Sequence, residues 1–89
     1  MRETWIVGVS MTPFGRFPAR SLASLAHEAV RDALADAAAP AASVQAIVFA
    51  NATQGALEGQ HGIRGQAALD GAGLGNAPVF NVENACASA

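Results

Sequence analysis

Three short apolar runs alternate with two segments of helical periodicity along the chain. The runs are residues 5–9 (Trp-Ile-Val-Gly-Val), 44–50 (Val-Gln-Ala-Ile-Val-Phe-Ala) and 78–82 (Pro-Val-Phe-Asn-Val). Short, β-branched, nearly continuous apolar runs are typical of strands buried on both faces of a parallel sheet. The pattern therefore predicts three buried strands.

Residues 21–38 form the clearest periodic segment and predict an amphipathic helix. Ser21 is the expected N-cap, and Pro40 ends the pattern. We expect His27 on the solvated face of this helix, with no chemical role. The apolar stripe comprises Leu22, Leu25, Ala26, Ala29, Val30, Ala33, Leu34 and Ala37, and the opposite face carries His27, Glu28, Arg31, Asp32 and Asp36.

Residues 63–74 predict a weaker second helix, and the segments 10–20 and 51–62 predict loops. The glycines at 71, 73 and 75 follow this helix rather than a strand, and Asn76 fills the last glycine position, so they do not form a dinucleotide-binding fingerprint. The order β-α-β-α-β predicts an α/β fold with parallel strands. The loop at 51–62 then lies at the carboxyl end of a strand, where ligand sites of parallel sheets gather.

Composition limits the chain to one small domain, residues 1–89. Hydrophobic residues make up 52% and charged residues 13%, which excludes a disordered tail and leaves little charge for a free surface. We expect part of that surface to be covered by further chain or by a second subunit. The net charge is −2, with five scattered arginines and no lysine, so no basic patch suits nucleic acid.

The single cysteine cannot form an internal disulfide, which favours a reducing, cytoplasmic setting. No apolar run reaches the length of about 18 residues that a membrane span needs, and no signal peptide is apparent. Asn51-Ala52-Thr53 fits a glycosylation acceptor pattern. Without secretion, we interpret that match as accidental.

Cys86 follows the third apolar run, at the point where another helix is expected to begin. One interpretation is a small buried hydrophobic residue. The other is a nucleophile, because unpaired N–H groups and the positive end of a helix favour thiolate and can hold an oxyanion. The small residues around Cys86 leave room for a substrate. Cys86 is therefore the candidate catalytic residue, and covalent acyl transfer is the chemistry that suits it.

Other functions of the cysteine, in a metal site or a protease, fit the sequence less well. Cys86, His61 and His27 have no metal-ligand spacing, so no metal is expected. A papain-like protease would need catalytic partners after its cysteine. His61 is interpreted as a polar loop residue and is left out of catalysis.

Three stretches together resemble the N-terminal part of the thiolase family. They are residues 6–17, the first strand and its loop with Thr12-Pro13-Phe14-Gly15-Arg16-Phe17; Gly59-Gln60-His61-Gly62-Ile63-Arg64, which opens the second helix; and Asn84-Ala85-Cys86-Ala87-Ser88. The last is similar to the family's nucleophile motif and is the most specific of the three. Met11 before Thr12-Pro13 is similar to the sterol-carrier-protein-type and acetyl-CoA acetyltransferase-like branch.

The resemblance implies a partial thiolase half-domain that is cut at the start of the nucleophile helix. It implies that Cys86 takes an acyl group from a coenzyme A thioester, which is a substrate rather than a bound cofactor, and that the complete protein is a dimer or tetramer. The family's later catalytic His and Cys motifs lie outside residues 1–89, so we expect an N-terminal fragment that is inactive alone. Two alternatives stay open: a small non-catalytic α/β interaction protein, and a fragment of a ketoacyl synthase, against which the stretch 59–64 argues.

Overall fold

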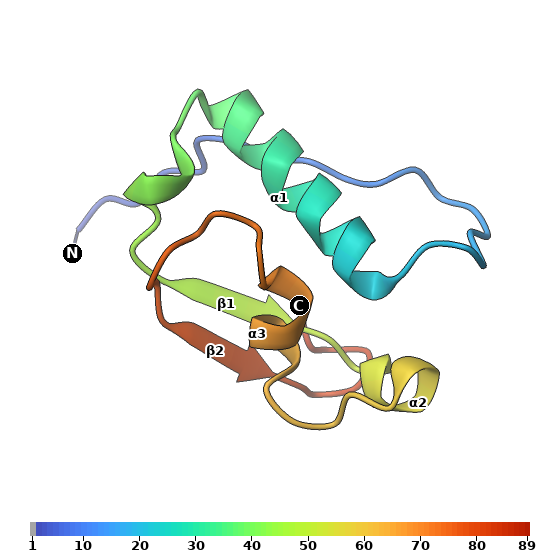
Figure 1. Cartoon of the computed structure of the whole chain (residues 1–89). Helices are drawn as coiled ribbons and strands as arrows, with labels where there is room; N and C mark the ends of the chain where they lie inside the picture. The colour runs from blue at the N-terminus through green and yellow to red at the C-terminus, as the bar shows by residue number, and fades with distance from the viewer. Residues whose placement is uncertain (1) are drawn as a thin grey trace.

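The computed structural model describes residues 2–89. Its elements in chain order are helix α1 (Leu22–Ala37), the 3₁₀ helix η1 (Ala41–Ser43), strand β1 (Ile47–Ala50), helices α2 (Gln54–Glu58) and α3 (Arg64–Leu69), and strand β2 (Val79–Val82). The long helix α1 lies above the sheet in Figure 1, and α3 lies beside the two strands. The chain is therefore a partial α/β unit, as the sequence predicted.

The two strands pair in parallel, with Ile47 opposite Val79 and Ala50 opposite Val82. The ladder continues at both ends, because Ile47 N donates to Pro78 O at 2.9 Å and Asn51 N donates to Val82 O at 3.3 Å. The parallel arrangement is confirmed. Both strands are shorter than the apolar runs that predicted them.

Helix α1 forms where the periodicity predicted it. The hydroxyl of Ser21 accepts a hydrogen bond from Ser24 N at 3.1 Å, which confirms the N-cap. At the other end Ala38 adopts φ 52°, and Ala39 N donates to Leu34 O at 3.0 Å, which closes the last turn two residues before Pro40. Every residue of the predicted apolar stripe is at least half shielded from solvent, whereas Arg31, Asp32 and Asp36 are exposed.

His27 does not lie on a solvated face, so that prediction was wrong. The side chain is partly buried between α1 and the turn after α3, with its ring close to Gly71. Its Nε2 atom is shielded from solvent and has no hydrogen-bond partner among the described residues. The shielded stripe of α1 is wide enough to include position 27, so the side chain of His27 faces the turn after α3.

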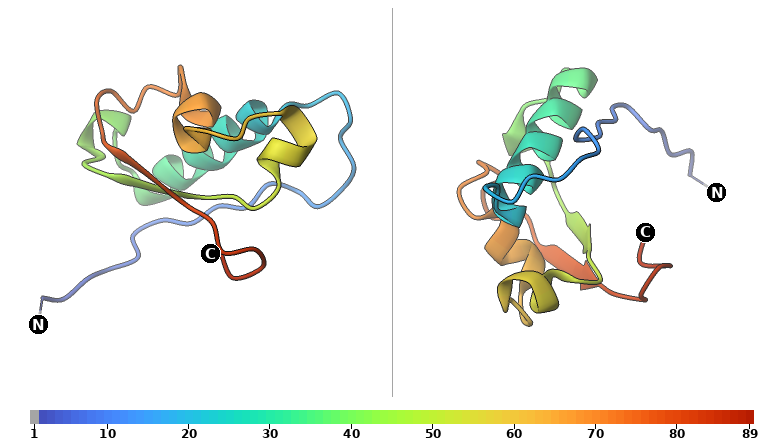
Figure 2. Two further views of the ribbon diagram at one scale, coloured as in Figure 1. Left: turned by 90° about the horizontal axis from the view of Figure 1, so that it is seen from below. Right: turned by 90° about the vertical axis from the view of Figure 1, so that its right-hand side faces the viewer.

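Helix α3 covers one face of the sheet. A β-carbon added to Gly65 would meet Val79 Cγ1 and Phe49 Cβ, so α3 packs directly onto that face. The buried apolar core is small and consists of Ala68, Leu69 and Leu74. Both views in Figure 2 place α1 and α3 on one side of the sheet, and the N-terminal segment and the C-terminal turn on the other.

The run at 5–9 is not a strand, which corrects the prediction of a third, fully buried strand. Trp5, Ile6, Val7 and Val9 are each more than half exposed. The segment runs along α1 instead, where Val9 N donates to Asp36 Oδ2 at 2.9 Å and Gly8 approaches the backbone of Ala33. The N–H of Val9 is thus bonded to a side chain of α1 and not to a neighbouring strand.

Two further boundaries differ from the sequence prediction. The predicted loop at 51–62 contains helix α2, because the side chain of Asn51 accepts hydrogen bonds from Thr53 N and Gln54 N at 3.0 and 2.7 Å and turns the chain. The predicted helix at 63–74 ends at Leu69, and the glycines that follow adopt positive φ. None of the helices in residues 2–89 has the length and apolar character needed to cross a bilayer.

Candidate functional site

Polar side chains from three segments meet at the carboxyl end of the two strands. Asn51 follows β1, Asn81 lies in β2 and Glu83 follows it, His61 comes from the connection between α2 and α3, and Arg64 is the first residue of α3. With Phe49, Ile63 and Val82 they line a cavity of about 200 Å³. This is the edge at which parallel sheets collect ligands.

Arg64 is held at this edge by the backbone carbonyl of Asn51, the residue that follows β1. Its Nη1 donates to Asn51 O at 3.0 Å. Its Nε is shielded from solvent and has no partner within residues 2–89. A guanidinium has five donors and no acceptor, so Arg64 brings one positive charge to the cavity with donor capacity left over.

Asn81 joins β2 to the start of α3. Its Oδ1 accepts a hydrogen bond from Gly65 N, and its Nδ2 donates to Gln66 Oε1 at 2.8 Å. The first bond satisfies one of the N–H groups that the beginning of a helix leaves unpaired. Asn81 thereby fixes the position of Arg64, which begins the same helix.

His61 packs closely over Gly55, whose missing side chain leaves room for the imidazole. The residue lies in the cavity wall with Arg64 and Asn81. The sequence placed His61 in a loop after β1, and the structure puts that loop at the cavity. His27 lies elsewhere, on α1, so the two histidines do not share a site.

Cys86 lies in a tight turn just beyond β2. Ala87 N donates to Asn84 O at 2.9 Å and Ser88 N donates to Ala85 O at 3.2 Å. The Ser88 hydroxyl accepts from Asn84 N at 2.8 Å and donates to Ala85 O at 2.7 Å, while the Glu83 carboxylate accepts from Ala85 N. Ala85 adopts φ 46°, a left-handed conformation that is uncommon for alanine.

The structure corrects the expected surroundings of Cys86. No helix follows β2 within the described chain, and the thiol is free and exposed rather than set among the N–H groups of a first helical turn. Ala85 N is bound by a carboxylate, so it is not available to an oxyanion. The turn therefore presents the sulfur to solvent but does not itself supply the activation that the sequence suggested.

The sequence identified Cys86 but assigned no role to Asn51, Arg64, Asn81 or Glu83. Their common signal is position: each lies near the carboxyl end of a strand or begins the helix packed against the sheet. Arg64 was noted only as the last residue of the stretch 59–64. Cys86 itself is not among the residues that line the cavity, and Glu83 is the link between cavity and turn.

Two comparisons with known proteins found similar sequences. The family described as thiolase, N-terminal domain, matches residues 4–89. A relative from Caenorhabditis elegans, the non-specific lipid-transfer protein-like 2, is 40% identical over 89 residues. The match covers 97% of this chain and 20% of the relative, so the chain spans about a fifth of that protein's length.

Proposed function

Because the chain belongs to the family of thiolase N-terminal domains, we propose that it is the part of an acyltransferase that carries the acyl-accepting nucleophile. The observation that supports this role is the exposed, free Cys86 in a tight turn directly after a parallel strand. An accessible thiol beside small side chains can reach a thioester carbonyl. Cys86 is the catalytic residue in this proposal.

The proposed reaction begins with the Cys86 thiolate attacking the carbonyl of an acyl coenzyme A. A new carbon–sulfur bond forms, the bond to the coenzyme A sulfur breaks, and coenzyme A leaves as its thiol after taking up a proton. A second acyl coenzyme A, through its α-carbon, or free coenzyme A then removes the acyl group from Cys86. Coenzyme A thioesters are substrates here, and no resident cofactor is invoked.

We further propose that residues 1–89 do not turn over substrate alone. In the turn at Asn84–Ser88 the N–H groups of Asn84, Ala85, Ala87 and Ser88 already have hydrogen-bond partners, so the turn does not offer the set of free donors that an oxyanion needs. Other parts of a larger, cytoplasmic homo-oligomer would supply them. The relative's name, which refers to lipid transfer, favours lipid-derived acyl groups as substrates.

Intact-mass spectrometry after incubation with acetyl coenzyme A tests the proposal. We expect slow addition of one acetyl group to Cys86, no addition in Cys86→Ala, and no steady release of acetoacetyl coenzyme A by the 89-residue chain. Iodoacetamide serves as the accessibility control and should react fully without denaturant. Full alkylation without any acetylation would contradict the proposal that Cys86 accepts an acyl group. Turnover by the 89-residue chain would contradict the proposal that catalysis needs groups from outside these residues.

The second candidate is a non-catalytic interaction protein. It is favoured by one observation: the sheet face opposite α3 exposes Val48, Phe80 and Val82. A stable, monodisperse species in size-exclusion chromatography, unchanged by Cys86→Ala and never acylated, would support this alternative over acyl transfer.

A further inference from the structure

Glu83 is the only charged side chain in residues 71–89, and it stands three positions before Cys86. Its carboxylate accepts a hydrogen bond from Ala85 N, inside the turn that carries the thiol. Because Ala85 directly precedes Cys86, standard bond lengths and the hydrogen bond keep the carboxylate within about 10 Å of the Cys86 sulfur. Nothing in the proposed acyl transfer uses this charge.

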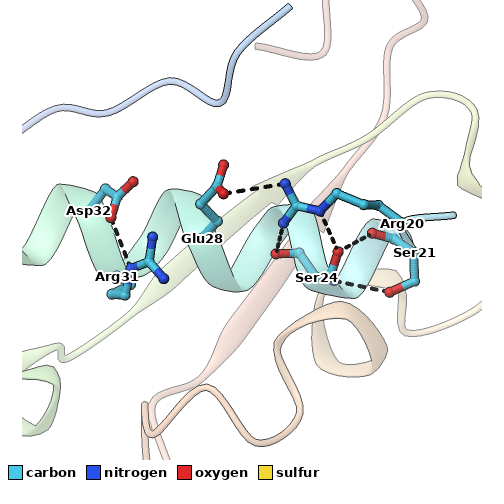
Figure 3. Close-up of polar contacts among 6 residues, drawn as sticks. All are labelled: Arg20, Ser21, Ser24, Glu28, Arg31 and Asp32. Atoms are coloured by element: carbon cyan, nitrogen blue, oxygen red, sulfur yellow. Dashed lines mark hydrogen bonds and ion pairs between the residues drawn. The ribbon is translucent and has the colours of Figure 1, made fainter. Parts of the chain in front are cut away.

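Among residues 2–89 no positive side chain forms an ion pair with Glu83. The two ion pairs of the described chain join Arg20 to Glu28 and Arg31 to Asp32, and both lie along α1 (Figure 3). The charge of Glu83 is therefore not neutralised by direct contact.

Arg64 is the positive side chain that shares a cavity with Glu83. With His61 neutral, the charges of Arg64 and Glu83 cancel over the cavity as a whole. Their positions differ, because Arg64 Nη1 is held on Asn51 O beside β1, whereas the Glu83 carboxylate is held inside the turn. The hydrogen bond thus places the negative charge, and not the positive one, in the turn of Cys86.

A fixed negative charge in this turn distinguishes acyl groups by their own charge. When a thioester carbonyl meets the Cys86 sulfur, a carboxylate on the same short acyl chain also comes near Glu83. Two negative charges about 7 Å apart in water repel each other enough to change a rate about two- to threefold. Glu83 is exposed, so the dielectric constant of water applies, and added salt screens the repulsion.

We propose that Glu83 is a specificity-determining residue, which makes Cys86 accept uncharged acyl groups in preference to short acyl groups that end in a carboxylate. This inference rests on the proposed function, because it states which thioesters Cys86 takes. In the transfer, the Cys86 thiolate bonds to the carbonyl carbon, the bond from that carbon to the thioester sulfur breaks, and the leaving thiol takes up a proton. Repulsion from Glu83 slows this attack for the anionic acyl group alone.

Alkylation measures the charge preference without acyl transfer. Iodoacetamide and iodoacetate both form a carbon–sulfur bond with Cys86 and release iodide, but only iodoacetate carries a negative charge. Intact-mass spectrometry of the folded protein at low ionic strength gives both rate constants. Any effect of Glu83 on the thiol itself changes both rates equally, so it cancels in the ratio of the iodoacetamide rate to the iodoacetate rate.

Glu83→Gln should lower this ratio about two- to threefold. The amide keeps an oxygen that can accept the hydrogen bond from Ala85 N, so the change removes the charge and retains the contact. Glu83→Asp keeps the charge and should keep the wild-type ratio. The matched control is Asp70→Asn, since Asp70 is an exposed carboxylate at the other end of the strands, beside Ile47 and Val79.

Propionyl and malonyl thioesters of N-acetylcysteamine extend the measurement to acyl transfer. The malonyl group has a carboxylate where the propionyl group has a methyl group, so the two are close in size. The ratio of the propionyl rate to the malonyl rate should fall in Glu83→Gln by the same two- to threefold factor. In about 1 M salt, where the screening length is about 3 Å, the wild-type ratios should approach those of Glu83→Gln.

Equal alkylation ratios in the wild type and Glu83→Gln would overturn the inference. An equal fall in Asp70→Asn would overturn it too, because the net charge of the chain would then be the cause. The salt dependence of the wild-type ratio gives a test that needs no variant, and a ratio unchanged by salt would contradict the role of Glu83. Absence of transfer from both thioesters, with an alkylation ratio that still depends on Glu83, would contradict the acyl-transfer proposal and support the charge preference at the thiol.

Discussion

Gly65 of α3 lies so close to Val79 of β2 that a β-carbon at position 65 would be 2.6 Å from Val79 Cγ1. The same atom would be 2.7 Å from Phe49 Cβ in β1. The helix therefore touches both strands at one residue without a side chain. This contact places Arg64 and the cavity at the strand ends, because Arg64 directly precedes Gly65 and begins the helix.

We predict that Gly65→Ala destabilises the protein by about 1–3 kcal/mol, the usual cost of forcing extra volume into a packed contact. Alanine normally stabilises a helix by about 1 kcal/mol relative to glycine. A loss of unfolding free energy in Gly65→Ala would therefore show that the steric contact outweighs helix propensity. Urea unfolding followed by circular dichroism measures it. Gly62→Ala is the matched control, because a β-carbon there has no heavy atom within 4 Å and its φ is not positive.

A neutral or stabilising Gly65→Ala would contradict close contact between α3 and the sheet. An equal loss of unfolding free energy in Gly62→Ala would mean that alanine disturbs the backbone of the connection between α2 and α3, and not the packing of α3 on the sheet.

The two ion pairs of α1 should contribute unequally. Arg20 and Glu28 are 3.2 Å apart, with side chains 32% and 24% exposed, and Arg20 also binds Ser24 twice. Glu28→Gln should therefore cost about 0.5–1 kcal/mol of unfolding free energy. The pair of Arg31 and Asp32 is open to solvent, with side chains 71% and 50% exposed, so Asp32→Asn should have no measurable effect.

Thermal or urea unfolding of Glu28→Gln and Asp32→Asn, at low and at high salt, measures how much unfolding free energy each pair contributes. The hydrogen bond and charge of Asp32 raise the pKa of Arg31, so Arg31 keeps its positive charge at neutral pH, and the difference between the two pairs is their exposure. A larger loss in Asp32→Asn than in Glu28→Gln would reverse the ranking and contradict the argument from burial.

The sequence pattern correctly predicted the elements that are determined by residues close together in the chain. The stripe from Leu22 to Ala37, capped by Ser21, is specified by residues a few positions apart, and it forms as predicted. The parallel pairing of β1 and β2 followed from the helical segment between them. Cys86 could be named because a lone cysteine after a strand is visible in the sequence itself.

Several of the wrong predictions depended on tertiary contacts that a local pattern does not specify, whereas the missed helix α2 and the early end of α3 have local causes. Apolar residues at 5–9 indicate burial only if neighbouring strands and a covered face exist; here they are exposed, and the N–H of Val9 bonds to Asp36 of α1. At Cys86 the side chains of Ser88 and Glu83 bind the N–H groups of Asn84 and Ala85 and form a tight turn in place of the expected helix. Arg64 and Asn81 come together through the packing of α3 on the sheet, which no spacing in the sequence reveals.

The exposed face of the sheet should make the chain self-associate. Val48 and Phe80 are 69% and 56% exposed on adjacent parallel strands, and clustered apolar surface of this kind drives association. Phe80→Ser should therefore lower the apparent mass at high concentration in analytical ultracentrifugation and reduce binding of an apolar dye, with little loss of stability. The matched change on the covered face, Phe49→Ser, should instead destabilise the fold by about 3 kcal/mol or more, because Phe49 packs against α3. Unchanged association in Phe80→Ser would show that another surface, such as the exposed segment at 5–9, joins the copies.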